Sequence, residues 1–140
     1  MMQYIKLFLI TVPTVILVDY IWVGKLMFKF YDTGIGALAR RMGGEFKPMV
    51  APIFIVYIVM AIGLTVFIYP RFINGNIDFK VFLLGALLGF VIYAIYDFTN
   101  YGTLANWSLK LSIIDILWGS FLSGLVSFIV LSIGKFLNII

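Results

Sequence analysis

Four apolar segments, each long enough to cross a lipid bilayer, constrain this sequence more than any other feature. A helix needs about 20 mainly apolar residues to span the hydrocarbon core, because it rises about 1.5 Å per residue and must close its backbone hydrogen bonds internally. The segments cover residues 3–24, 49–69, 79–100 and 109–133. The sequence therefore predicts an all-α membrane protein, a four-transmembrane-helix bundle that forms a single integral membrane domain over residues 1–140.

Composition excludes several classes of function. Hydrophobic residues make up 64% of the chain and charged residues 11%, which makes the lipid bilayer the main partner of the surface. The ten Lys and Arg are scattered and form no basic stripe, so we expect no nucleic acid partner. Without Cys or His there is no thiol nucleophile, imidazole base or usual zinc ligand. We predict no cofactor.

The connection over residues 25–47 is the longest, and it mixes apolar residues with Lys and Arg. One stretch of it contains the apolar residues Leu26, Phe28, Phe30, Tyr31, Ile35 and Leu38. The pattern fits a short amphipathic helix on the membrane surface, and it equally fits an ordinary basic loop. Gly43 and Gly44 are expected to end this segment.

Basic residues are distributed unequally between the two sides of the predicted bundle. One side carries six, at Lys25, Lys29, Arg40, Arg41, Lys47 and Lys110; the other carries four, at Lys6, Arg71, Lys80 and Lys135. Because cytoplasmic loops are enriched in Lys and Arg, the bias predicts a cytoplasmic 25–47 connection and termini on the outside of the cell membrane.

Three of the six acidic residues, Asp19, Asp97 and Asp115, fall inside predicted spans. A charge at mid-bilayer costs about 2.5 to 3.5 kcal/mol on insertion scales, so such residues are often functional. Counting along the helices puts all three within about 10 Å of the same membrane face. The alternative is structural, since an Asp near the end of a span can bond a Trp or Tyr or hold helices together.

Helical spacing adds polar and aromatic neighbours to these aspartates. The neighbours are Tyr93 and Asn100 beside Asp97, Trp22 beside Asp19, and Ser112 and Trp118 beside Asp115. Together the eight residues predict a proton, cation or substrate site that opens toward the basic connection, whose Lys or Arg would act as counter-ions. No catalytic residue and no metal ligand set can be assigned.

Small residues form a second pattern on the third and fourth spans. Gly85, Gly89, Gly119 and Ser123 recur at four-residue steps, which let helix backbones approach closely. The pattern predicts packing either within the bundle or between the protomers of a homo-oligomer, such as a dimer.

The chain also contains an internal similarity. Residues 19–26 and 97–104 both read Asp, aromatic, three variable positions, Gly, a variable position and Leu. This similarity fits a duplicated two-helix unit, that is, two parallel two-helix repeats. Chance similarity between apolar helices is the alternative.

The motifs Asp19-Tyr20-Ile21-Trp22, Tyr96-Asp97-Phe98-Thr99-Asn100 and Asp115-Ile116-Leu117-Trp118-Gly119 resemble a known family over nearly the whole chain. It is the family of small bacterial membrane proteins catalogued as domain of unknown function twenty-one seventy-seven. The resemblance implies a four-helix protein of the bacterial inner membrane and carries no activity.

Three functions fit these residues. The preferred hypothesis is a small transporter, an ion- or proton-coupled permease with a shared aspartate site. The second is a membrane enzyme acting on a lipid or isoprenoid, with Asp as base or Mg²⁺ ligand. The third is an accessory or structural membrane protein whose aspartates serve assembly. We lean toward a protein that is not an enzyme.

Overall fold

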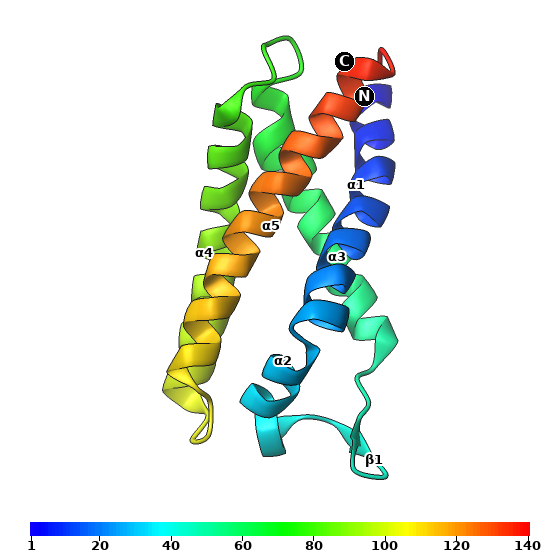
Figure 1. Cartoon of the computed structure of the whole chain (residues 1–140). Coiled ribbons are helices and arrows are strands. Elements are labelled where there is room, and N and C mark those ends of the chain that lie inside the picture. The colour runs from blue at the N-terminus through cyan, green and yellow to red at the C-terminus, as the bar shows by residue number, and fades with distance from the viewer.

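The computed structural model describes all 140 residues and shows four long helical segments joined by shorter connections (Figure 1). Helix α1 (Met2–Ile21) continues into the π-helical turn η1 (Trp22–Leu26), and helix α3 (Val50–Gly63) continues through η3 (Leu64–Ile68) into η4 (Tyr69–Arg71). Helices α4 (Phe79–Thr103) and α5 (Leu109–Phe136) complete the bundle. All four segments are long and apolar enough to cross a membrane, so the predicted four-helix architecture is confirmed.

The connection between the first two spans is helical where its pattern is amphipathic. Helix α2 (Phe28–Ile35) and the short turn η2 (Gly36–Leu38) lie at the end of the bundle opposite the termini (Figure 1). Tyr31 of α2 is buried, because this helix packs against the beginning of α5. The segment is therefore helical, as the amphipathic alternative predicted, and it packs against protein, whereas its place on the membrane surface stays a prediction.

A two-stranded hairpin follows α2 and was not predicted. Strands β1 (Arg41–Met42) and β2 (Glu45–Phe46) pair antiparallel. Gly43 and Gly44 form the two-residue loop with φ angles of 61° and 87°. Positive φ at both central residues is the geometry that a tight hairpin turn requires, and glycine adopts it without steric cost.

Helices α4 and α5 pack closely along much of their length through small residues. The surfaces of Gly85 and Gly89 lie against Ser123 and Gly119, and all four residues are buried within one chain. These residues therefore serve packing within the bundle, and a dimer through them would require α4 and α5 to separate. Homodimer formation stays a prediction that needs another face of the molecule.

The half of the bundle that contains the termini is filled mainly by aliphatic side chains. Leu7, Val126, Val130 and Leu131 are fully buried there. A single buried polar pair joins α1 to the end of the second span, where the hydroxyl groups of Thr11 and Tyr69 lie 2.8 Å apart. The spanning aspartates lie in the opposite half of the bundle.

Replacing Gly89 by Ala tests the close contact between α4 and α5. A Cβ atom at residue 89 would lie 2.3 Å from the backbone oxygen of Gly119, which cannot move away without shifting a helix. We expect Gly89→Ala to lower the free energy of unfolding by about 1 to 3 kcal/mol, measured by thermal or denaturant unfolding in detergent.

Gly102→Ala is the matched control on the same helix, because nothing lies within 4 Å of a Cβ atom at that position. It should leave stability unchanged or raise it slightly, since Ala favours helix over Gly. Equal stability of the two variants would contradict the close helix contact.

Candidate functional site

Asp19, in the last turn of α1, is held by donors from two other helices. The Tyr57 hydroxyl of α3 donates to Oδ2 at 2.7 Å, and the indole N–H of Trp118 on α5 donates to Oδ1 at 2.8 Å. Trp22 stacks on Trp118 with 4.5 Å between the ring centroids. Both carboxylate oxygens of Asp19 are therefore satisfied by side chains that the bundle brings together.

Asp115, in the second turn of α5, receives its donor from the connection. The Tyr31 hydroxyl of α2 donates to Oδ1 of Asp115 at 2.7 Å. Burial of the phenol, and then the negative charge of Asp115, raises the pKa of Tyr31 above its usual value. Tyr31 therefore keeps its proton at physiological pH and remains a donor to the carboxylate.

Asp97, near the end of α4, is the exception among the three. Its side chain is 0% exposed, and neither carboxylate oxygen accepts a hydrogen bond. Two neighbouring donors are used elsewhere, because Trp107 Nε1 donates to Ser112 Oγ at 2.9 Å and Ser112 Oγ donates to the backbone oxygen of Asp97 at 3.4 Å. The carboxyl group of Asp115 lies near that of Asp97, and no hydrogen bond joins the two groups.

No Lys or Arg reaches these carboxyl groups, so the expectation of basic counter-ions is wrong. The only ion pair of the chain joins Arg41 to Asp32 at 2.7 Å, within the connection itself. The reason is the orientation of α2, which buries Tyr31 in the bundle and leaves Lys29 exposed. Asp19 and Asp115 are met by hydroxyl and indole donors, and Asp97 by none.

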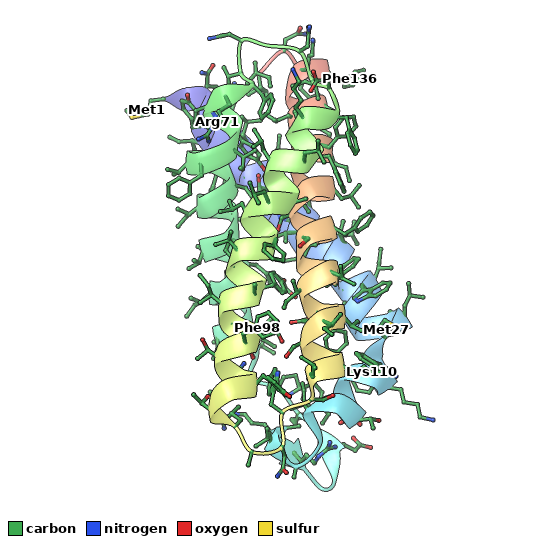
Figure 2. All side chains as sticks on the ribbon, turned by 90° about the vertical axis from the view of Figure 1, so that its left-hand side faces the viewer. Met1, Met27, Arg71, Phe98, Lys110 and Phe136 are labelled. Carbon is green, nitrogen blue, oxygen red and sulfur yellow. The ribbon has the colours of Figure 1, made fainter.

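The predicted site residues separate into two neighbouring groups at one end of the bundle. Asp19, Trp22 and Trp118 form the first group, and Asp97, Ser112 and Asp115 form the second. In Figure 2, the labels of Phe98, which follows Asp97 in the chain, and Lys110 mark this end of α4 and α5. The three carboxyl groups do not converge into one metal-ligand cluster.

Two further predicted residues, Tyr93 and Asn100, belong to neither of these two groups. The Tyr93 ring packs directly over Gly119, where a Cβ atom would lie 2.2 Å from it. Asn100 lies beside Tyr96 and makes no side-chain hydrogen bond to any of the three aspartates. Tyr93 thus packs between α4 and α5, whereas the part of Asn100 in the site stays a prediction.

Two tyrosines that donate hydrogen bonds to the carboxylates, Tyr31 and Tyr57, were not predicted as site residues. Tyr57 is the one residue with a polar tip in the otherwise apolar helix Val50–Gly63, and that isolation is a usable signal. Tyr31 was assigned to the apolar side of an amphipathic segment. Nothing in its spacing indicated that α2 would fold back onto α5.

Fold and site together define a multi-pass membrane protein with buried carboxyl groups at one end of a four-helix bundle. Residues 4–132 match the model of a family described as "Predicted membrane protein (DUF2177)", so the chain belongs to this family, as the sequence motifs implied. Neither the comparison with curated proteins nor the comparison with solved structures finds a match. The family description gives membrane location and no activity.

Tyr31→Phe removes the hydroxyl group that donates to Asp115, so we expect the free energy of unfolding at neutral pH to fall by about 1.5 to 3 kcal/mol. The unfolded chain loses the tyrosine proton first, at about pH 10, because burial raises the pKa in the folded protein. The stabilisation by this hydroxyl is therefore complete below about pH 10 and is lost as pH rises further.

Thermal unfolding of both proteins in detergent across this range measures the effect, and the difference between them should shrink above about pH 10. Tyr20→Phe is the control, because Tyr20 is 53% exposed and its hydroxyl makes no hydrogen bond to another side chain. A stability difference for Tyr31→Phe that is absent at neutral pH, or that does not shrink in alkali, would contradict the assigned bond.

Proposed function

We propose that this protein is a small proton-coupled transporter in which Asp97 and Asp115 together bind one proton. The observation that supports it is the fully buried Asp97 side chain, whose oxygens lack any donor while a second carboxyl group lies beside it. Two adjacent carboxylates repel each other strongly away from water. A proton shared between them removes one charge and supplies the missing hydrogen bond.

A proton fits this pair better than a divalent cation does. Mg²⁺ is bound in near-octahedral geometry by about six oxygens, and Ca²⁺ takes six to eight. Only two carboxyl groups meet here, since Asp19 already accepts hydrogen bonds from Tyr57 and Trp118. The same shortage of ligands weakens the hypothesis of an enzyme that holds Mg²⁺ on its aspartates.

Asp19 has a different role in this proposal. Its two donors come from α3 and α5, so the carboxylate ties three helices together. This is the structural role that the accessory-protein hypothesis assigns to all three aspartates. We assign this role to Asp19 and not to Asp97, because the Asp97 carboxyl group makes no bond that would hold a partner helix.

Proton exchange would occur from the end of the bundle that carries α2 and the hairpin. This end has six of the ten basic residues, which favours a cytoplasmic location in the cell membrane, with both termini outside. The terminal half of the bundle is packed with aliphatic side chains, and in this proposal that packing closes the path toward the outer side. Transport requires that half to open, and a homo-oligomer formed through another face would support the movement.

Infrared difference spectroscopy of the reconstituted protein tests the shared proton directly. Between about pH 5 and pH 9 we expect a carbonyl band of a protonated carboxyl group that persists near neutral pH and is lost in alkali. Asp97→Asn and Asp115→Asn should each remove this band, because either change breaks the pair. Asp32→Asn, which removes an exposed carboxylate from the Arg41 ion pair, should leave it intact.

A pH jump on a solid-supported membrane then tests coupling to transport. Wild type should give a transient charge displacement as the buried pair takes up its proton, and both Asn variants should lose it. Wild type without the band and without the displacement would refute the proton site. A band without any displacement would leave a buried proton that does not exchange, and this would refute the transporter.

A further inference from the structure

A basic pocket opens where α2 meets the beginning of α5. It has a volume of about 570 Å³, and its polar lining includes Lys29, Thr33, Ser108 and Lys110. No carboxylate lines it, and neither lysine takes part in an ion pair. The pocket therefore combines two uncompensated positive charges with two hydroxyl groups, which is a suitable environment for a phosphate group.

An apolar groove of about 360 Å³ lies further along α5. Its five lining residues are all hydrophobic: Trp22, Ile114, Leu117, Trp118 and Phe121. The stacked rings of Trp22 and Trp118 give it a rigid wall, whereas the Leu117 side chain is 64% exposed. In a bilayer this exposed side faces the hydrocarbon, so the groove is open to an acyl or isoprenoid chain.

The pocket and the groove lie on one face of the same helix. Lys110, Ile114, Leu117 and Phe121 follow one another at steps of four, three and four residues, which keeps them on one side of α5. Lys110 is in the first turn of α5, at the end of the membrane span, as its label in Figure 2 shows. The groove lies about one to three helical turns deeper, about 6 to 16 Å into the bilayer.

We propose that the basic pocket and the apolar groove together bind one phosphate-bearing lipid. The phosphate lies between Lys29 and Lys110, and a hydrocarbon chain lies against Trp22 and Trp118. The two lysines select an anionic headgroup, because a zwitterionic lipid offers a compensating positive charge that they repel. The adjoining groove selects a lipid over a soluble phosphate, since only a lipid fills both volumes. This site is separate from the carboxyl pair of the proposed function.

Quenching of tryptophan fluorescence by brominated lipids tests the site, because two of the three tryptophans line the groove. The protein carries Trp107→Phe, so that emission comes from Trp22 and Trp118. It is reconstituted in phosphatidylcholine vesicles with brominated phosphatidylglycerol or brominated phosphatidylcholine as quencher. We expect the anionic lipid to be preferred by at least about tenfold, given about fivefold for each lysine near the surface.

Lys29→Gln with Lys110→Gln should reduce this preference to nearly none, and Lys29→Arg with Lys110→Arg should retain it. Lys47→Gln is the matched control, since Lys47 belongs to the same connection but does not line the pocket. The three exchanged lysine side chains are exposed, so these changes should leave the fold of the Trp107→Phe protein as it is.

Three results would overturn the proposal. The first is equal quenching by the two brominated lipids in the protein that keeps both Lys29 and Lys110. The second is an equal loss of preference in Lys47→Gln, which would indicate diffuse attraction to an anionic surface. The third is displacement of the brominated anionic lipid by inorganic phosphate alone, which would indicate a soluble anion site without a lipid chain.

Discussion

A carboxylate that enters a bundle of apolar helices costs several kcal/mol unless donors, a cation or a proton compensate its charge. Much of this fold can be understood from how that cost is met at three positions. Asp19 of α1 accepts hydrogen bonds from Tyr57 of α3 and Trp118 of α5, so these two bonds hold three spans together. Asp115 of α5 accepts a hydrogen bond from Tyr31 of α2, and this bond holds α2, and with it the long connection, against α5. Asp97 has no such donor and is left with a second carboxyl group as its neighbour.

The closeness of Asp97 and Asp115 depends in turn on the small residues between α4 and α5. Gly89 lets the backbone of α5 approach so closely that a Cβ atom there would lie 2.3 Å from the Gly119 oxygen. Gly119 also leaves the space in which the Tyr93 ring lies. Larger residues at these positions would move the helices apart and separate the carboxyl groups. The glycines that the sequence presents as a packing motif are therefore also what brings the carboxyl pair together.

The helical architecture and the depth of the aspartates were predictable because both follow from counting along the chain. Hydrophobic length defines a span, and a rise of about 1.5 Å per residue places Asp19, Asp97 and Asp115 near one membrane face. What counting does not give is the rotation of each helix about its axis. Because of that rotation, Trp118 donates its hydrogen bond to Asp19 on another helix. The helical spacing had suggested Asp115, on the same helix as Trp118, as its neighbour. The rotation also decides that Asn100 lies beside Tyr96 and makes no hydrogen bond to the carboxyl groups.

The connection was the hardest part to predict, because its tertiary contacts override its local pattern. The hydrophobic residues of α2 fit a helix on the membrane surface, and nothing local distinguishes Tyr31 from Phe30 beside it. The difference is a single hydroxyl group, which can reach Asp115 only after α5 has formed. Since that bond joins residues 84 positions apart, it belongs to the folded bundle and leaves no periodic signal in the sequence.

Helix α2 also relates the two proposed sites to each other. Lys29 and Thr33 line the basic pocket, while Tyr31 between them bonds Asp115 of the carboxyl pair. A lipid phosphate held by Lys29 restrains the same short helix that supplies the donor to Asp115. If the lipid binds more tightly when Tyr31 is hydrogen-bonded to Asp115, then bound lipid must favour that hydrogen bond by the same factor, because coupling between two sites is reciprocal.

Protonation of the carboxyl pair removes negative charge from the acceptor, Asp115, and so weakens its hydrogen bond with Tyr31. Lipid binding at the membrane surface and proton binding within the bundle would then oppose each other through α2, which makes this helix the physical link between them.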